Sequence, residues 1–226
     1  MSNIETHVLP DAERAKFAAA GYLNELLANH QNVPVLLLIS GGSSLAVLDH
    51  VHLFNFENVT VMQVDERITG SVQDQNAHAF GESEFGEISQ GITFIPIEQS
   101  EKPEASAAKY EKVLKDWVKN HPDAFVVAIL GMGPDGHTAG EMPGFDNLFR
   151  GPQWVVGYDA GSASKFPNRV TVTRTFLTEV VTEAVLYFTG EEKKKAFEQI
   201  HNLPAGVIFD IKKVAIFTDQ NVDVRL

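Results

Sequence analysis

The sequence contains no cysteine in its 226 residues. Disulfide scaffolds, thiolate nucleophiles and cysteine-ligated zinc sites are therefore excluded. Disulfides are rare in reducing compartments, so their absence favours an intracellular location.

Long hydrophobic runs are also missing. The longest, residues 33–39, includes Pro34 and is far shorter than the roughly 20 apolar residues that a membrane-spanning helix needs. The first residues show no basic region followed by an apolar stretch, which a secretory signal would have. We expect a cytoplasmic protein with no membrane partner.

Basic residues are outnumbered by acidic ones. The chain has 18 Lys and Arg against 30 Asp and Glu, a formal net charge of −12. A protein that neutralises nucleic-acid phosphates normally has a basic face, whereas here only Lys193, Lys194 and Lys195 cluster. We expect no nucleic-acid partner, although this cluster could bind one small phosphate. The sequence leaves the oligomeric state open.

The hydrophobic pattern alternates between two periods along the chain. Short apolar runs rich in β-branched residues predict strands at 34–39, 59–64, 92–97, 125–130, 154–157, 185–189 and 214–218. Amphipathic stretches predict helices at 11–28, 103–119 and 191–201. This alternation predicts one α/β domain over residues 1–226, a three-layer αβα sandwich with a mainly parallel, Rossmann-like sheet. The chemistry should then lie at the carboxyl ends of the strands.

A glycine–serine segment, Ser40-Gly41-Gly42-Ser43-Ser44, follows one predicted strand and opens a predicted helix. Its glycines allow close approach to a ligand, and free amides at a helix start favour an anion such as phosphate. The alternative is a tight turn in which Ser43 is only an N-cap. The segment lacks the Lys-Ser/Thr ending of a triphosphate-binding loop and does not fit the GxSxG of a serine nucleophile.

A second glycine-rich segment, residues 131–136, also follows a predicted strand. Its letters spell GxGxxG, and Asp159 lies about where a ribose-binding acid would be expected. However, Pro134 and Asp135 fill positions next to the pyrophosphate, where a carboxylate would repel it. The motif also lies in the middle of the chain instead of in the first βαβ unit. We therefore disfavour dinucleotide binding.

The same segment brings Asp135 within two residues of His137 on a loop at a strand end. A carboxylate can orient a histidine and keep it suited to act as a general base on water. His50 and His52, two residues apart on an expected helix, do not face one ligand. We interpret the remaining histidines as surface or packed residues: His7, His30, His78, His121 and His201.

Charged residues flank three further predicted elements. Asp65 and Arg67 follow a strand, where the acid could orient or abstract a proton and the guanidinium could bind a carboxylate, a phosphate or an oxyanion. Lys165 and Arg169 precede a strand. Lys193 lies at a helix start, where a cation opposes the helix dipole, so either an anionic partner or simple tolerance at an exposed site explains it.

Taken in order, five motifs of the chain resemble the glucosamine-6-phosphate isomerase/6-phosphogluconolactonase family. They are SGGSS, VDER, LGMGPDGHTAGEMPG, SKFPNRVTVT and TGEEK. The resemblance extends from about Ser40 to Lys193, and GMGPDGHTA is its most specific part. It implies a cytosolic αβα enzyme that needs no metal or other cofactor. The lactonases of this family hydrolyse 6-phosphoglucono-δ-lactone to 6-phosphogluconate in the oxidative pentose phosphate pathway.

The resemblance also implies roles for individual residues. It assigns the substrate phosphate to Gly41, Gly42 and Ser43, with Arg169 and Lys193 as cationic partners. It makes His137 the general base, oriented by Asp135, and places Arg67 and Lys165 at the ring end of the site. Either cation could stabilise the oxyanion, and Asp65 is a further catalytic candidate.

Two departures from the family pattern leave the substrate contacts of these loops open, and two alternative functions are considered. Residues 68–76 lack the usual proline and Ser-Asn pair, and Gly140-Glu141-Met142 replaces a serine and bulky apolar residues. A glucosamine-6-phosphate deaminase would have a glutamate where Met142 stands and a tyrosine where Arg67 stands, so the lactonase is favoured. A third possibility is a non-catalytic sugar-phosphate-binding regulator, which would need the phosphate site but not the base.

Overall fold

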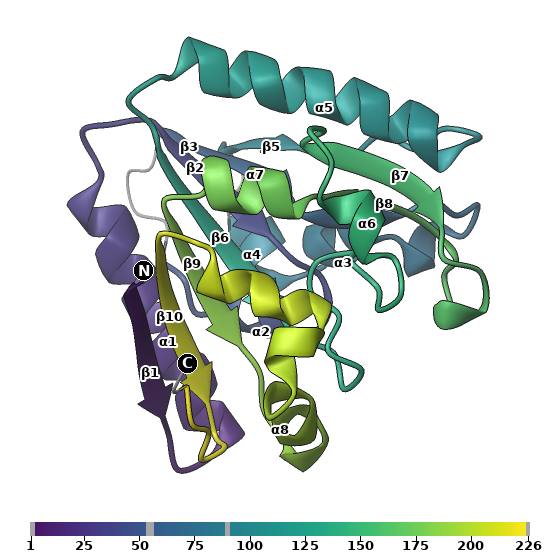
Figure 1. Ribbon diagram of the computed structural model, residues 1–226. Helices are drawn as coiled ribbons and strands as arrows, with labels where there is room; N and C mark the ends of the chain where they lie inside the picture. Colours follow the sequence, from purple (N-terminus) through teal and green to yellow (C-terminus); the bar gives the residue numbers. More distant parts are fainter. Residues whose placement is uncertain (1–2, 53–56, 89–90, 225–226) are drawn as a thin grey trace.

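The computed structural model describes residues 3–52, 57–88 and 91–224. Its main sheet has seven parallel strands (Figure 1). In spatial order these are β1 (Asn3–Val8), β10 (Lys213–Thr218), β9 (Glu183–Tyr187), β6 (Phe125–Gly131), β2 (Val35–Ile39), β3 (Val59–Gln63) and β5 (Thr93–Ile95). The predicted α/β class and parallel sheet are confirmed, and every strand pair in this sheet is parallel.

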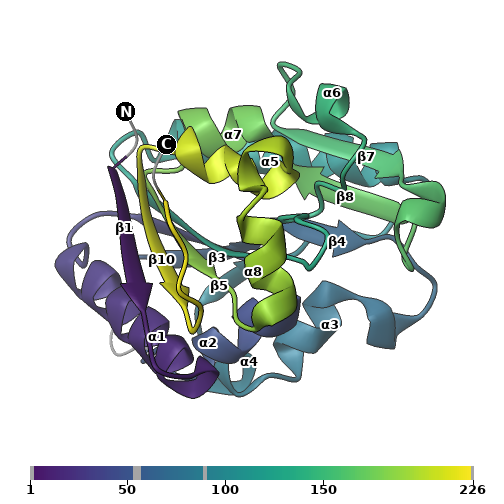
Figure 2. The same cartoon turned by 60° about the horizontal axis from the view of Figure 1, so that its bottom comes forward.

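Helices cover both faces of the sheet, as Figure 2 shows. One face carries α1 (Ala12–Asn29), α2 (Leu45–Leu48), α3 (Asn76–Gly81) and α4 (Glu84–Ile88), and the other α5 (Pro103–Asn120), α7 (Arg174–Glu179) and α8 (Glu191–Phe197). Strand side chains alternate between the two layers. In β2, for example, Leu36 packs in the α5 layer and Leu37 in the α1 layer, and both are fully buried. The predicted three-layer sandwich follows from this alternation.

The two longest helices begin where local chemistry favours a start. The Asp11 carboxylate accepts the backbone N–H of Arg14 at 2.8 Å and so caps α1. Pro103 occupies the first turn of α5, where its missing N–H costs no hydrogen bond. Both helices agree with the amphipathic stretches predicted at 11–28 and 103–119.

A second sheet differs from expectation. It has three antiparallel strands, β4 (Asp65–Arg67), β8 (Asn168–Val172) and β7 (Val155–Asp159), in that order. The strand predicted at 154–157 therefore pairs outside the parallel sheet. Asp65 and Arg67 form their own strand instead of ending β3, and Arg169 lies inside β8 instead of before a strand. A hydrophobic pattern can locate a strand in the sequence, but it does not specify which strands pair with it.

The helix expected after the glycine–serine segment is also shorter than predicted. Residues 42–44 form a single 3₁₀ turn, and α2 ends at Leu48, so His50 and His52 do not lie on a helix. The helix predicted at 191–201 ends at Phe197 as α8. The short helix α6 (Asp146–Phe149) and α7 were not predicted from sequence.

The carboxyl ends of β2 and β6 lie side by side at the centre of the sheet. From β2 the chain continues to β3 and β5 on one side, whereas from β6 it continues to β9 and β10 on the other. Such a reversal of strand order leaves a crevice between the two connections, and ligands of open α/β sheets bind there. The two glycine-rich segments therefore meet at the same point.

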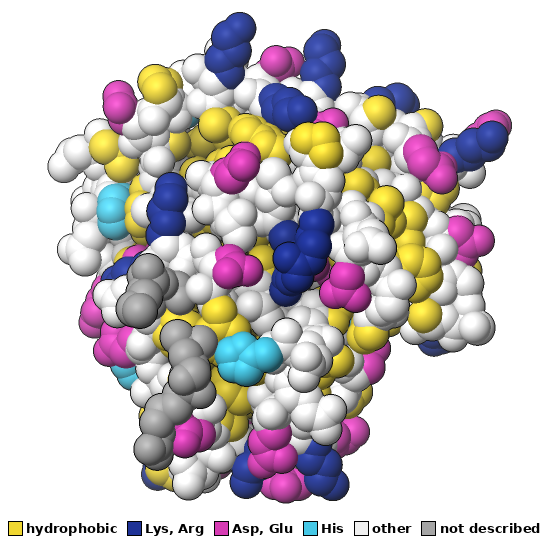
Figure 3. Space-filling model, in the orientation of Figure 1, with side chains coloured by type: hydrophobic (Ala, Val, Ile, Leu, Met, Phe, Trp, Pro, Cys, Tyr) yellow, Lys and Arg dark blue, Asp and Glu magenta, His cyan; other side chains and the backbone are white. Residues whose placement is uncertain are grey.

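Among the described helices, none is long and apolar enough to cross a membrane. The face of the molecule drawn in Figure 3 carries acidic and basic side chains interspersed over α5 and its neighbours.

Candidate active site

A pocket of about 230 Å³ opens at this reversal point. Its walls come from the loop after β2, the loop after β6, strand β4 and the side chains of Asn76, Arg169 and Lys193. Most of the predicted site residues line it, namely Gly41, Gly42, Ser43, Asp65, Arg67, His137, Arg169 and Lys193. Asp135 and Lys165 are not part of the lining.

His137 lines the pocket and is in contact with the neighbouring acid, Asp135. Oδ1 of Asp135 lies 2.6 Å from Nδ1 of His137 and 3.2 Å from its backbone nitrogen. The hydrogen bond from His137 lowers the pKa of Asp135, so this carboxylate is ionised and accepts a hydrogen bond from Nδ1–H. Nε2 then carries a free lone pair. The His137 side chain is 35% exposed, which gives that nitrogen access to water.

Gly133 makes this arrangement possible by having no side chain. A Cβ at this position would lie 2.2 Å from Nδ1 and Cε1 of His137 and 2.5 Å from Oδ1 of Asp135. The backbone N–H of Gly133 donates to the carbonyl of His137 at 2.9 Å, which closes the loop. The glycine is therefore required by the imidazole that folds over it.

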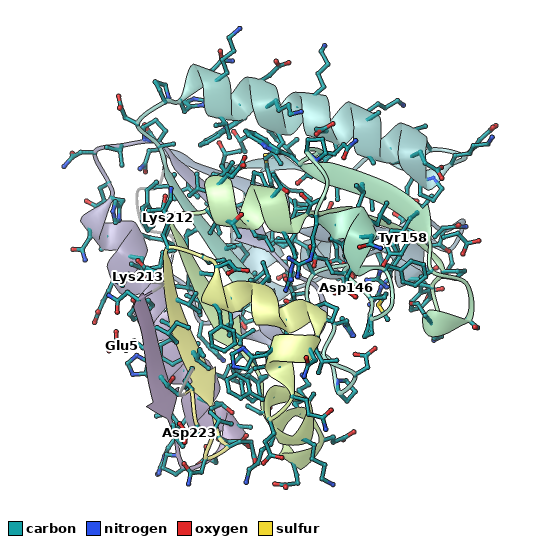
Figure 4. All side chains as sticks on the ribbon, viewed as in Figure 1. Glu5, Asp146, Tyr158, Lys212, Lys213 and Asp223 are labelled. Carbon is teal, nitrogen blue, oxygen red and sulfur yellow. The ribbon has the colours of Figure 1, made fainter. Side chains whose placement is uncertain are left out.

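The loop after the histidine is held by hydroxyl groups from the second sheet. Tyr158 donates its hydroxyl proton to the carbonyl of Gly140 at 2.6 Å, and the Gly140 N–H donates to Thr171 Oγ1 at 3.0 Å. Burial raises the pKa of Tyr158 to about 12, so it remains a donor. Figure 4 shows Tyr158 on β7. Ala139 has a φ of 49°, a left-handed conformation that costs energy in a residue other than glycine and is often found at functional sites.

A cationic corner lies at the glycine–serine segment. Lys193 Nζ donates to Ser43 Oγ at 3.2 Å, and Gly42 has a φ of 66°, which glycine adopts without strain. Desolvation lowers the pKa of Lys193, and the charge of Glu192 opposes this shift. Within the described residues, no carboxylate forms an ion pair with Lys193. Ser43 lies inside the 3₁₀ turn, and the N-cap positions are Gly41 and Ser44, so Ser43 is not the N-cap. The corner can accept an anion.

Arg67 and Lys165 differ in their relation to the pocket. The Arg67 guanidinium carbon lies 4.6 Å from the centre of the Phe166 ring, and its NH1 donates to the carbonyl of Asp74 at 3.1 Å. Lys165 Nζ lies 4.9 Å from the same ring, but the residue is exposed and does not line the pocket. Of these two residues, Arg67 lines the pocket and Lys165 does not.

Asp65 and Arg169 form a buried ion pair. Arg169 NH2 lies 2.7 Å from Asp65 Oδ2, and the two side chains are 7% and 5% exposed. NH1 of Arg169 also donates to Ser164 Oγ at 3.3 Å. Asp65 therefore holds Arg169 in place, and its own carboxylate is occupied, which disfavours a role as proton acceptor.

The sequence interpretation missed Asn76, a buried residue of the pocket wall. Its side-chain amide donates to the carbonyl of Asp65 at 3.2 Å, and a Cβ on Gly41 would lie 2.3 Å from its Oδ1. Asn76 thus separates β4 from the glycine–serine segment. Gln75-Asn76 stood out in the sequence only as a departure from the family pattern, so the signal was present but was not linked to the pocket.

Glu141 is buried away from the pocket. Its Oε2 lies 3.9 Å from Nε of Arg174, and both carboxylate oxygens are buried. Desolvation raises the pKa of Glu141 to about 8, partly offset by Arg174. Met142 is also buried and does not line the pocket.

The other histidines lie outside the pocket, as predicted. Three stack on aromatic rings: His7 on Phe217, His30 on Phe125 and His201 on Phe209. No group of three or more His, Asp or Glu side chains in the described ranges is arranged to hold a metal ion.

Known proteins show the same fold and related sequences. A 6-phosphogluconolactonase of Mesorhizobium japonicum is 27% identical over 205 residues, which cover 85% of this chain and 83% of the relative. A 6-phosphogluconolactonase of Neisseria meningitidis is 27% identical over 176 residues, 73% of each chain. The crystal structure of 6-phosphogluconolactonase from Thermotoga maritima superposes with a TM-score of 0.74 over 96% of this chain and 99% of the other, at 22% identity.

The sequence profile of one family covers nearly the whole chain. It is described as glucosamine-6-phosphate isomerases/6-phosphogluconolactonase and matches residues 10–216. The match includes both glycine-rich segments, β4, β8 and Lys193. The chain belongs to the glucosamine-6-phosphate isomerase/6-phosphogluconolactonase family.

Proposed function

We propose that this protein hydrolyses 6-phosphoglucono-δ-lactone to 6-phosphogluconate, a step of the oxidative pentose phosphate pathway. The observation that carries the proposal is that one pocket contains two features. One is the imidazole of His137, which Asp135 orients, and the other is the cationic corner formed by Ser43 and Lys193. A phosphorylated lactone needs both. The similar proteins of Mesorhizobium and Neisseria, named as 6-phosphogluconolactonases, support this choice within the family.

Substrate binding begins at the phosphate. In the proposal its oxygens accept hydrogen bonds from the amides of Gly42 and Ser43 and from Nζ of Lys193. Lys193 is partly desolvated and makes no ion pair with a carboxylate of the described residues, so a dianionic phosphate would supply a counter-charge. Arg169 also lines the pocket, but its ion pair with Asp65 balances its charge.

Hydrolysis then proceeds by general-base catalysis. Nε2 of His137 takes a proton from a water molecule, whose oxygen attacks the lactone carbonyl carbon. Negative charge develops on the carbonyl oxygen, and the Arg67 guanidinium donates hydrogen bonds to it. The ring C–O bond then breaks, and protonated His137 returns the proton to the departing ring oxygen. Water and lactone are thus converted to the open-chain acid, which loses its carboxyl proton to solvent.

The family's other activity, aldose–ketose isomerisation with loss of ammonia, finds no support in the pocket. Glu141 faces Arg174 inside the protein, and residue 142 is a buried methionine. No carboxylate from this loop reaches the pocket lining. A non-catalytic binder would need no acid behind the histidine, yet Asp135 is in contact with it.

One assay distinguishes these functions. Freshly prepared phospholactone and glucosamine-6-phosphate are supplied separately, and acid release is compared with ammonia release after subtraction of the spontaneous hydrolysis rate. We expect acid release from the lactone only. Ammonia release would identify a deaminase, and no release from either substrate would identify a binding protein.

A further inference from the structure

Glu66 is a fully buried acid that lies between two residues of the pocket wall but does not line the pocket itself. It precedes Arg67 in strand β4, and no role was predicted for it from sequence. Buried carboxylates are costly unless all their acceptor positions are used. Its hydrogen bonds therefore indicate what it does.

Four donors converge on this carboxylate. Oε1 accepts the backbone N–H groups of Arg67 and Asn76, both at 2.6 Å. Oε2 accepts the backbone N–H of Ala77 at 2.7 Å and the side-chain amide of Gln63 at 2.9 Å. Because Asn76 is ten residues away in sequence, these bonds close the loop 67–76 at its base.

The closed loop holds the Arg67 side chain as well as its backbone. Asp74, whose carbonyl accepts NH1 of Arg67 at 3.1 Å, lies within the loop. Asn76, at the loop's end, contacts Gly41 of the glycine–serine segment through its side chain. One carboxylate thus fixes both ends of the wall that carries Arg67.

We propose that Glu66 is a positioning residue, whose carboxylate closes the loop 67–76 and so holds the Arg67 guanidinium where the lactone oxyanion forms. The expected effect on the rate rests on the proposed lactone hydrolysis, whereas the closing of the loop 67–76 by Glu66 does not. Glu66 itself does not touch substrate. Displacement of a transition-state donor by about 1 Å can reduce the rate roughly 10²-fold, so the loop matters although it is remote from the reacting atoms.

Glu66→Gln is the sharpest substitution because it keeps size and shape. A glutamine has one acceptor oxygen and an NH2 group, and the NH2 group would face N–H donors at whichever position it occupies. Gln63 cannot turn its amide to compensate, since its own Oε1 accepts the backbone N–H of Ile97 at 2.8 Å. The loop therefore loses at least one of its closing hydrogen bonds.

Glu183→Gln is the matched control. Glu183 is also buried, accepts a hydrogen bond from the Tyr22 hydroxyl and lies 3.0 Å from Nζ of Lys213. It lies at the amino end of the sheet, where Figure 4 labels Lys213. We expect this variant to lose thermal stability without a change in kcat.

Two measurements test the proposal on the full-length protein. Hydrogen–deuterium exchange should show faster exchange of peptides covering 67–77 in Glu66→Gln than in the wild type, with the β6 peptides unchanged. The kcat for the phospholactone should fall about tenfold or more, with KM changed less. In an Arg67→Ala background the same substitution should reduce kcat no further, because the group that it positions is absent.

The outcomes separate the two hypotheses. Unchanged exchange of the loop, or a kcat loss equally large in the Arg67→Ala background, would overturn the positioning role. A wild-type protein that does not accelerate lactone hydrolysis would overturn the proposed function and the catalytic consequence with it. The exchange data would then still decide whether Glu66 closes the loop. If Glu66→Gln does not fold, Glu66→Asp, which keeps the charge but shortens the reach, replaces it in both measurements.

Discussion

Oδ1 of Asp135 and Nδ1 of His137 lie 2.6 Å apart, with only Gly136 between the two residues in sequence. The contact therefore lies within a single tight loop. The backbone hydrogen bond from Gly133 N–H to the carbonyl of His137 closes this loop. Because an ionised carboxylate can only accept a hydrogen bond, it keeps the proton on Nδ1 and leaves Nε2 to face the pocket. The first prediction follows from this contact.

Replacement of His137 by alanine should lower kcat about 10²–10⁴-fold, the usual contribution of a general base. Asp135→Asn should also lower kcat, by less, because an amide can offer its NH2 group to Nδ1 and so favour the wrong tautomer. Steady-state kinetics on the phospholactone measure both. His121→Ala, at the end of α5 away from the pocket, is the control and should retain activity. A His137→Ala enzyme with wild-type kcat would refute the proposed mechanism.

Removal of the Lys193 side chain should weaken substrate binding more than it slows the chemical step. A charge-assisted hydrogen bond contributes about 1.5–3 kcal/mol, which corresponds to roughly a 10- to 150-fold rise in KM for Lys193→Ala. Inhibition by 6-phosphogluconate should weaken by a similar factor. The exposed Lys195 offers a control of the same charge, and its alanine variant should bind as the wild type does. A large kcat loss at unchanged KM would place Lys193 at the reacting end instead.

Arg67 and Lys165 should respond very differently to substitution. Arg67→Ala removes the proposed oxyanion donor and should reduce kcat about 10²–10³-fold. Lys165→Ala removes an exposed cation outside the pocket and should change kcat by less than about threefold, within the effect of a rim charge. Parallel kinetics of the two variants decide which cation meets the oxyanion. The reverse order of effects would transfer that role to Lys165.

Gly133→Ala tests the imidazole's position without changing its chemistry. The added methyl group would lie 2.2 Å from the His137 ring, and the ring must turn away to accommodate it. We expect a kcat loss of about 10²-fold or more from this displacement, with thermal unfolding close to that of the wild type. Gly21, where a Cβ would meet nothing within 4 Å, provides the control variant Gly21→Ala. Full activity in Gly133→Ala would show that the ring position is not critical.

Glu141 should make the protein less stable as the pH rises. Its pKa is about 8 in the folded state against 4.5 in the unfolded chain, so between these values the unfolded state binds fewer protons. The free energy of unfolding must then fall with rising pH across that window. Glu141→Gln abolishes this contribution, so we expect its stability relative to the wild type to increase from pH 5 to pH 8, about the range between the two pKa values. Urea denaturation at both pH values measures it, and a difference independent of pH would contradict the raised pKa.

Much of the architecture was predictable because its signals are local. The run of five apolar residues identifies β2, and the amphipathic period identifies α5. Both signals can be recognised without reference to the rest of the chain. The pair Asp135 and His137 was predictable for the same reason, since two residues separated by one glycine must lie close together. The interpretation of residues 1–226 as one domain stays a prediction.

Other features depend on contacts between distant parts of the chain. The ion pair of Arg169 with Asp65 joins residues 104 positions apart, and the bond of Lys193 to Ser43 joins residues 150 apart. Sequence could identify these residues as candidates but could not pair them. Nor could it separate Arg67 from Lys165, because both cations contact the same Phe166 ring and only the path of β4 carries one of them into the pocket.

The sequence by itself determined the fold class, the two glycine-rich segments and the acid–histidine pair, because hydrophobic period and short spacing act over a few residues. The tertiary structure alone decided that those segments meet, that Asp65 is occupied by Arg169 and that Glu66 closes the loop behind Arg67. The physical reason is that strand order brings the ends of β2 and β6 together, and no local pattern specifies strand order.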